Sequence, residues 1–174
     1  MRKVIALVGL ILALGLINGS IIGKEKHLAT GKVVFIELAP VDPRSLMQGD
    51  YMALNFALSR EIYNALPKIE QGKRWRHDVD ASDGQVIVSL DQKLIASFVR
   101  IHQDKALSEG EMLLDYRIRD GAVKFATNAF FFQEGDAKTY ESAQYGEFRV
   151  DDEGELLLVA MRDIELNKLV AEIP

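Results

Sequence analysis

The sequence predicts a mainly β protein of the α+β class. We expect a single N-terminal transmembrane helix followed by one antiparallel, strand-rich domain, a sandwich or an open barrel, with two short helices. Three observations support this. Residues 4–23 form an uncharged, apolar run, apolar and polar residues alternate over much of the chain after residue 31, and helical patterns there are short. With 174 residues, of which 48% are hydrophobic and 27% charged, the composition fits one globular domain with an anchor.

The apolar run at residues 4–23 is long enough to cross a bilayer. As a helix it spans about 30 Å, the thickness of the hydrocarbon core. Arg2 and Lys3 precede it, as basic residues precede both signal peptides and anchors. The run exceeds the roughly 7–15 residues of a signal peptide's apolar region, and no A-x-A sequence follows it directly. We therefore expect an uncleaved anchor with its N-terminus inside the cell; a cleaved signal peptide is the alternative.

This interpretation divides the chain into four segments, and the spacing of glycines in the anchor allows it to pair with another membrane helix. The segments are a basic N-terminus at residues 1–3, the anchor at 4–23, a juxtamembrane linker at 24–31 and an extracytoplasmic β-rich domain at 32–174. Small residues at intervals of four allow two membrane helices to approach closely, although glycine is also common in membrane helices that do not pair. Helix pairing is therefore possible through Gly15, Gly19 and Gly23.

Strands are predicted where apolar and polar residues alternate. Within Asp50–Leu58 the residues Met52, Leu54 and Phe56 share one apolar face, and Tyr51, Ala53 and Asn55 share the other. Two hairpins are expected, one between Gln85–Leu90 and Lys93–His102 and the other between Gly146–Val150 and Glu155–Met161. A further strand is expected at Lys32–Leu38.

The clearest hairpin joins Glu111–Arg119 to Ala122–Phe132. Its turn is Asp120-Gly121, the preferred dipeptide of a type I′ turn, and a two-residue turn fixes the register of the strands. The predicted cross-strand pairs are Ile118 with Val123, Tyr116 with Phe125, and Leu114 with Thr127.

Helical patterns are short in the strand-rich part. Ser59 is placed to cap a helix at Arg60–Leu66, which Pro67 would end, and Asp136 is placed to cap Ala137–Gln144. The segment Asp163–Val170 fits neither pattern clearly.

The most specific segment is D-P-R-S-L-M-Q-G-D-Y-M-A-L-N-F at residues 42–56. Pro43 suits the first position of a short helical turn, and Gly49 stands where a left-handed residue would end it. The segment resembles the GDYXXLXY-motif family of bacterial membrane-anchored proteins. Gly49, Asp50, Tyr51 and Leu54 match the motif, and Phe56 replaces its final Tyr. Residues 130–150 also resemble this family.

The resemblance implies a single-pass bacterial membrane protein. Because a leading anchor usually leaves its N-terminus inside the cell, we expect this protein in the inner membrane with its C-terminal domain in the periplasm. The resemblance implies no activity, because the family's function is unassigned; its members look like companions of polytopic membrane proteins. We therefore expect an accessory domain that docks onto an integral membrane partner. The alternative is a small-ligand-binding or hydrolytic domain that uses the region of Asp42, Arg44 and Asp50.

Several function classes lack support in the sequence. The chain has no cysteine and a net charge of −5, which argues against thiol chemistry and nucleic-acid binding. No phosphate-binding glycine motif occurs, so we expect no cofactor. His27, His77 and His102 are scattered, and Asp151-Asp152-Glu153-Gly154 reads as a hairpin turn, so we expect no metal site. Pro43 and Gly49-Asp50 follow the order seen in signal-peptidase-like hydrolases, but Pro40 stands where those have the nucleophilic serine.

The candidate binding or motif residues are the polar and motif positions of the two family-like segments. The competing interpretation is structural: Arg44 would pair with Asp42 or Asp50, and Arg149 with Glu147 or Glu134, to hold turns. The full candidate set is Asp42, Arg44, Gly49, Asp50, Tyr51, Leu54, Glu134, Tyr140, Tyr145, Glu147 and Arg149.

Overall fold

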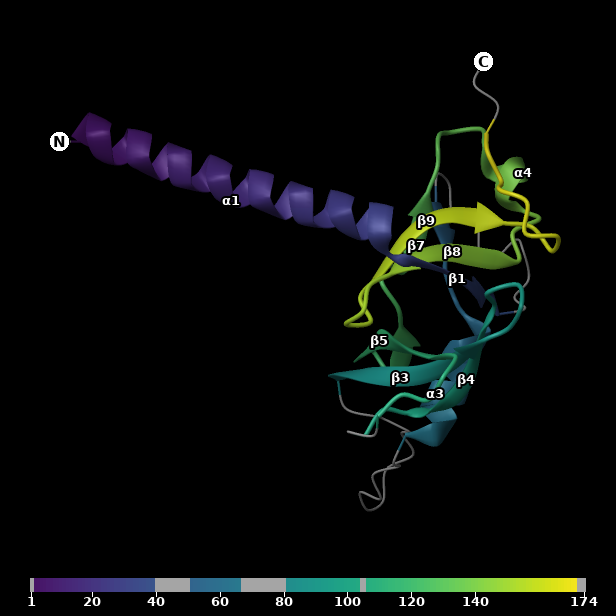
Figure 1. Cartoon of the computed structure of the whole chain (residues 1–174). Coiled ribbons are helices and arrows are strands. Elements are labelled where there is room, and N and C mark those ends of the chain that lie inside the picture. Colours follow the sequence, from purple (N-terminus) through teal and green to yellow (C-terminus); the bar gives the residue numbers. More distant parts are fainter. Residues whose placement is uncertain (1, 40–50, 67–80, 104–105, 172–174) are drawn as a thin grey trace, which may run out of the picture.

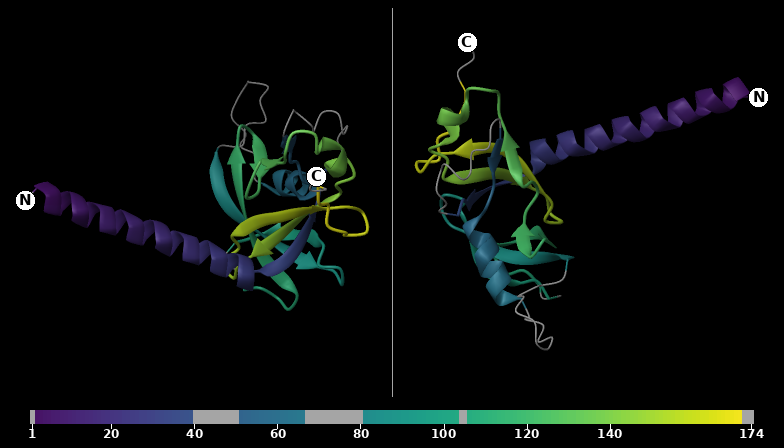
Figure 2. Two further views of the ribbon diagram at one scale, coloured as in Figure 1. Left: turned by 90° about the horizontal axis from the view of Figure 1, so that it is seen from above. Right: turned by 180° about the vertical axis from the view of Figure 1, so that it is seen from behind.

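A long helix projects from a strand-rich body in the computed structural model, which describes residues 2–39, 51–66, 81–103 and 106–171. Helix α1, Arg2–Thr30, extends away from the body in all views (Figures 1 and 2). Every side chain described from Lys3 to Lys26 is exposed. Among the described residues, α1 is the one helix long and apolar enough to span a membrane, with a mean hydropathy of 2.4 over its most apolar part.

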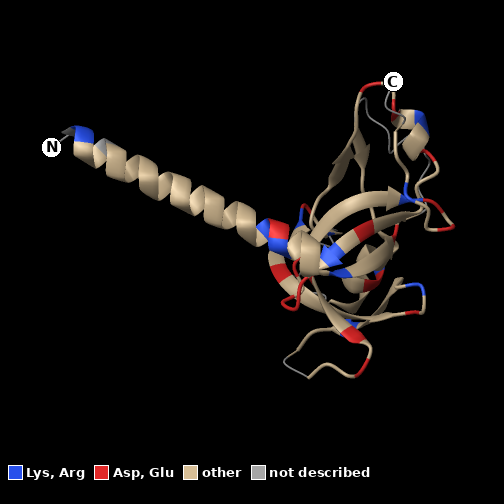
Figure 3. Cartoon of the chain, turned by 45° about the horizontal axis from the view of Figure 1, so that its top comes forward, with Lys and Arg blue, Asp and Glu red and all other residues tan. Residues whose placement is uncertain are grey.

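The segment predicted as a linker, residues 24–31, is helical as far as Thr30. Figure 3 shows α1 with basic residues near its N-terminus, a long uncharged stretch, and charges again where it meets the body. The apolar run therefore continues as one helix into the folded domain.

The body consists of antiparallel sheets around one core, as the sequence predicts. The first sheet has the order β1-β8-β9, from Lys32–Glu37, Tyr145–Val150 and Leu156–Arg162. The second has the order β4-β3-β5-β6, from Ala96–Ile101, Ser82–Leu90, Glu111–Arg119 and Ala122–Lys124. A two-stranded ribbon pairs β2, Tyr51–Ala53, with β7, Ala129–Phe131.

Phe56 joins the two larger sheets in the core. Its ring lies 5.6 Å from that of Phe148 on β8 and 5.7 Å from that of Phe125, which follows β6 (centroid to centroid). Met52, Leu54 and Phe56, which the sequence places on one apolar face, are all buried in the core. Strand β2 nevertheless ends at Ala53, well before the predicted Leu58.

The helix after Phe56 begins earlier than predicted. Helix α3 is Ala57–Ala65, and Phe56 occupies the N-cap position without a side-chain hydrogen bond. Ser59 lies inside the helix, and its buried hydroxyl has no hydrogen-bond partner. The prediction that Ser59 caps the helix is therefore wrong. Burial of Leu58 and Ile62, one helical turn apart, outweighs the preference for a polar cap.

The β5–β6 hairpin confirms the predicted turn but only part of the register. Asp120 and Gly121 both have positive φ, at 53° and 69°, as a type I′ turn requires. Ile118 pairs with Val123, but the ladder ends at Lys124. The predicted pairs Tyr116–Phe125 and Leu114–Thr127 are wrong, because Phe125 turns into the core and the chain then pairs with β2 through β7.

The other predicted elements are present with altered lengths. The hairpins β3–β4 and β8–β9 form as expected, each with one irregularity in its register. Helix α4, Ala137–Tyr140, is shorter than predicted, and Asp136 at its N-cap makes no side-chain hydrogen bond. The ambiguous C-terminal segment is a turn in which the Asp163 carboxylate accepts hydrogen bonds from the backbone N–H groups of Glu165 and Asn167.

Candidate functional site at the junction of helix and sheet

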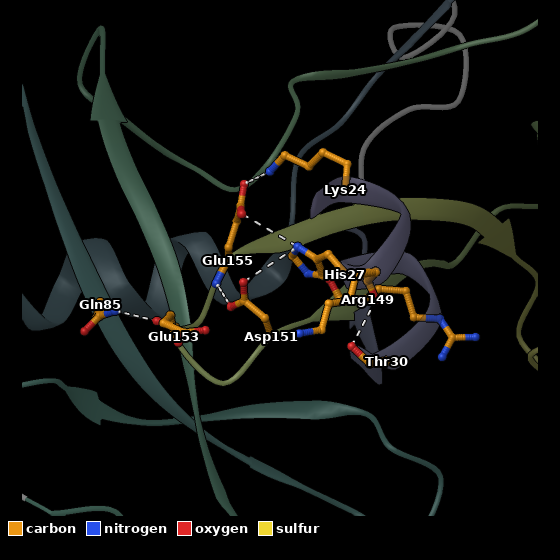
Figure 4. A network of polar contacts seen from close by, with 9 residues as sticks. Lys24, His27, Thr30, Gln85, Arg149, Asp151, Glu153 and Glu155 are labelled. Atoms are coloured by element: carbon orange, nitrogen blue, oxygen red, sulfur yellow. Dashed lines mark hydrogen bonds and ion pairs between the residues drawn. The ribbon is translucent and has the colours of Figure 1, made fainter. Parts of the chain in front are cut away.

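Among the described side chains of α1, one is buried, and it lies in the last two turns of the helix. His27 is 7% exposed, whereas its helical neighbours with described side chains are exposed. It lies against the β8–β9 hairpin, where polar side chains from three segments meet (Figure 4). The helix is thus joined to the body by a polar residue rather than by its apolar ones.

The ring of His27 has a defined orientation. Its Nε2 lies 3.1 Å from the carbonyl oxygen of Arg149 on β8. Because a carbonyl oxygen only accepts, Nε2 must carry a proton and donate. The other nitrogen, Nδ1, faces two carboxylates: Asp151 Oδ2 at 3.7 Å and Glu155 Oε2 at 3.6 Å.

Each of these carboxylates is held by its second oxygen. Asp151 Oδ1 accepts a hydrogen bond of 2.8 Å from the backbone N–H of Glu155, across the hairpin turn. Glu155 Oε1 is paired with the ammonium group of Lys24, one helical turn before His27. One oxygen of each carboxylate is therefore left facing Nδ1.

The hairpin turn is also held on its far side by the second sheet. The side chain of Gln85 on β3 donates to the carbonyl oxygen of Glu153 at 2.8 Å, and the N–H of Asp115 on β5 donates to that of Gly154 at 2.8 Å. Gly154 has φ +98°, a conformation that favours glycine. These contacts fix the position of Asp151 and Glu155 relative to both sheets.

Gly31 allows the close approach of helix and sheet. The N–H of Gly31 donates to the carbonyl oxygen of His27 at 2.8 Å, and the carbonyl oxygen of Gly31 accepts a hydrogen bond of 3.2 Å from Arg149 Nη1. A Cβ at this position would lie 2.7 Å from the His27 carbonyl oxygen and 3.1 Å from the Cβ of Arg149. Only glycine fits here without a shift of the backbone.

A groove of about 330 Å³ opens beside the junction. His27 and Asp151 line it together with Lys26, Lys32 and the hairpin turn. The Asp151 and Glu155 side chains are 27% and 48% exposed, whereas that of His27 is 6% exposed. An imidazole and two carboxylates at the edge of a solvent-filled groove can form an ion pair or bind a cation.

A second polar contact involves the buried side chain of Glu147. Arg162 on β9 donates to Glu147 Oε2 from Nε at 2.7 Å and from Nη2 at 2.5 Å, and its Nη1 donates to the carbonyl oxygen of Leu166 at 3.0 Å. The predicted pairing of Arg149 with Glu147 or Glu134 is therefore not formed. Arg149 contacts Gly31 instead, because its side chain lies beside the end of α1.

Two further grooves lie elsewhere on the body. One, of about 670 Å³, lies between β9 and the β3–β5–β6 side of the second sheet, and burial raises the pKa of the Tyr116 hydroxyl that lines it. The other, of about 490 Å³, lies between α3 and the β5–β6 turn. None of the three grooves is lined by a described residue of the predicted site set.

The predicted site residues fall into two groups. Asp42, Arg44, Gly49 and Asp50 lie outside the described residues, as does His77. The described ones do not form one site: Tyr51 contacts Phe131, Glu147 pairs with Arg162, and Arg149 contacts Gly31. The remaining members are the buried Leu54 and Tyr140, the half-buried Tyr145 and the exposed Glu134.

Comparison with known proteins identifies the family. A family model described as GDYXXLXY protein matches residues 13–161. The chain belongs to the GDYXXLXY protein family. The match confirms the resemblance drawn from Gly49, Asp50, Tyr51 and Leu54, with Phe56 in place of the last Tyr. No curated protein and no solved structure matches this GDYXXLXY chain.

Sequence reasoning missed the junction residues of this GDYXXLXY protein. In the sequence, His27 stands apart from the other two histidines, Asp151 falls in the predicted hairpin turn and Glu155 begins the predicted strand that follows. His27 lies more than 120 positions before the two acidic residues, so no local motif connects it to them. The available signal was a histidine about one helical turn after the predicted end of the membrane helix, in a segment that also contains Lys24.

Proposed function

We propose that this GDYXXLXY protein is a membrane-anchored accessory module that docks onto an integral membrane partner. In this proposal residues 4–23 lie in the inner membrane of a bacterium, the N-terminus faces the cytoplasm and the strand-rich body is periplasmic. The observation that carries the proposal is the continuity of α1, whose exposed apolar side chains need an apolar environment and whose last turn is part of the body.

This continuity sets how far the body lies from the bilayer. Residues 24–30 separate the apolar run from the body, and at 1.5 Å per residue they span about 10 Å. The contacts of His27 and Gly31 hold these turns against β8, so the body has a fixed orientation on the helix. A domain held this close to the headgroups is well placed to contact a protein embedded in the same membrane.

An aromatic pair on the β2–β7 ribbon, the exposed Phe131 and the half-buried Tyr51, is our candidate for the docking contact. Phe131 is 74% exposed, whereas Phe130 and Phe132 pack against Tyr140. The ring of Phe131 lies 5.7 Å from that of Tyr51, the tyrosine of the family motif. Exposed aromatic rings of this kind are frequent anchors at protein interfaces.

A photo-crosslinking experiment tests this proposal. The photoreactive residue p-benzoylphenylalanine would replace Phe131 in the full chain, expressed in its native membranes. We expect a crosslinked adduct with an integral membrane protein. The matched control is the same replacement at Ile164, which is 71% exposed but lies in the turn after β9. Recovery of the uncrosslinked chain alone from both variants would contradict the proposal.

The glycine face of α1 is a second candidate contact within the membrane. A Cβ built on Gly15, Gly19 or Gly23 meets no atom within 4 Å, so this face is open to another helix. The partner's own membrane helix would pack there if the anchor contributes to docking.

A further inference from the structure

The junction of α1 with the β8–β9 hairpin has the donor set of a divalent-cation site. His27, Asp151 and Glu155 each offer one ligand atom, and the three atoms lie within 4.8 Å of one another. We propose that these residues bind one divalent cation of the zinc class, which fastens the end of α1 to the hairpin. The inference concerns the junction alone and does not depend on the docking proposal.

The hydrogen bond at Nε2 prepares His27 for metal binding. Because Nε2 donates to the carbonyl oxygen of Arg149, a neutral imidazole has its lone pair on Nδ1, the nitrogen that faces Asp151 and Glu155. Histidines that bind metals usually donate their other ring N–H to a carbonyl or carboxylate in this way. A lone pair facing two carboxylate oxygens is repulsive unless a cation lies between them. The His27 side chain is also only 6% exposed, so water gives it little compensation.

The two carboxylates are oriented before any cation binds. Asp151 uses Oδ1 for the N–H of Glu155, and Glu155 uses Oε1 for Lys24. Their other oxygens lie 3.7 and 3.6 Å from Nδ1. In a tetrahedral zinc site with bonds of about 2.0–2.2 Å, neighbouring ligand atoms are about 3.3–3.6 Å apart. The two distances to Nδ1 therefore need shifts of only a few tenths of an ångström, and the two carboxylate oxygens lie within 4.8 Å of each other.

The types of ligand atom and the neighbouring groove indicate which class of cation fits this site. An imidazole nitrogen with two carboxylate oxygens suits zinc and its neighbours, whereas calcium and magnesium prefer oxygen ligands alone. Three protein ligands leave the fourth tetrahedral position for water. The 330 Å³ groove lined by His27 and Asp151 gives water access to that position. The competing arrangement is an ion pair between protonated His27 and the same carboxylates.

Metal titration of the full chain in detergent micelles tests the proposal. After treatment with a chelator, calorimetric titration with Zn²⁺ should show one ion bound per chain. Asp151→Asn should weaken binding about 100-fold or more, since even outer contacts of metal ligands contribute 10–100-fold. The fold should survive, because the asparagine Oδ1 still accepts from the N–H of Glu155. Asp152→Asn is the matched control: it removes the same charge from the next residue of the turn, whose side chain is 90% exposed, and should leave the affinity unchanged.

A spectroscopic measurement distinguishes the ligand set from general electrostatic attraction. Co²⁺ bound to the wild-type chain should give the intense visible absorption of a four-coordinate site. His27→Gln should abolish this absorption. Absence of saturable Zn²⁺ binding by the wild type would overturn the proposal in favour of the ion pair. Equal affinities of the Asp151→Asn and Asp152→Asn variants would also overturn it.

Discussion

At the scale of single residues, the pair of Glu147 and Arg162 places a buried carboxylate against a partly buried guanidinium in the body. The carboxylate is 7% exposed and accepts two hydrogen bonds from one guanidinium. The same guanidinium lies over the ring of Phe35, 5.9 Å from its centroid, and donates to Leu166. One side chain thus connects β1, β8 and the turn that follows β9.

Removal of the charge on Glu147 should strongly destabilise the fold. Glu147→Gln leaves the Arg162 guanidinium partly buried without a counter-charge, and removing one partner of such a pair typically costs about 3 kcal/mol or more in free energy of unfolding. Chemical denaturation of the full chain in detergent, followed by circular dichroism, measures this difference.

Glu37→Gln on β1 is the matched control for this variant. Glu37 is exposed, and its loss should change the free energy of unfolding by less than about 0.5 kcal/mol. Equal midpoints for the two variants would mean that the buried pair contributes nothing to stability.

At the scale of elements, the pattern of alternation predicted most strands and the hairpins between neighbouring strands, but not the pairings of strands far apart in the chain. The residues of β5 alternate between half-buried and buried positions as expected, and Ile118 pairs with Val123. The hairpin ends early because Phe125 contributes more by packing against Phe56 than by extending the ladder. This competition depends on a residue almost 70 positions away in the chain. Local alternation carries no information about such a contact, and the same is true of the pairing of β7 with β2.

Gly31 is the residue on which the junction between α1 and the sheet depends most directly. Gly31→Ala would place a Cβ 2.7 Å from the backbone oxygen of His27, so the helix end or β1 must move. We expect α1 to lose its fixed orientation on the body while the sheets remain folded.

Distance measurements between spin labels can detect this loss of orientation. The chain has no cysteine, so Ser20→Cys on α1 and Ser97→Cys on β4 provide two unique labelling sites, both exposed. In lipid nanodiscs we expect one narrow distance distribution, which Gly31→Ala should broaden. Gly110→Ala, in the loop before β5, is the control for a glycine substitution away from the junction. Equally narrow distributions in all variants would contradict the assigned role of Gly31.

At the scale of the whole molecule, the sequence predicted the long apolar N-terminal helix, the antiparallel body and the family, but not how helix and body are joined. The first three follow from composition, alternation and a short motif, all of which are local. The junction depends on His27 meeting Asp151 and Glu155, which only the order β1-β8-β9 brings together. The predicted pairing of Arg149 failed for the same reason, because its partner Gly31 lies at the other end of the chain.

The junction makes a specific prediction about processing of the N-terminal segment. Cleavage at the small residues Ala29-Thr30-Gly31 would remove His27 and Lys24 from the body and expose the carbonyl oxygen that His27 contacts. Because the last turns of α1 are part of the fold, we expect the protein to keep them. In cells it should migrate at its full 19.5 kDa and stay with the membranes after a carbonate wash. A reporter fused after Pro174 should be active outside the cytoplasm. A soluble product shorter by roughly 15–30 residues, the length of a signal peptide, would show that the segment is a cleaved signal rather than an anchor.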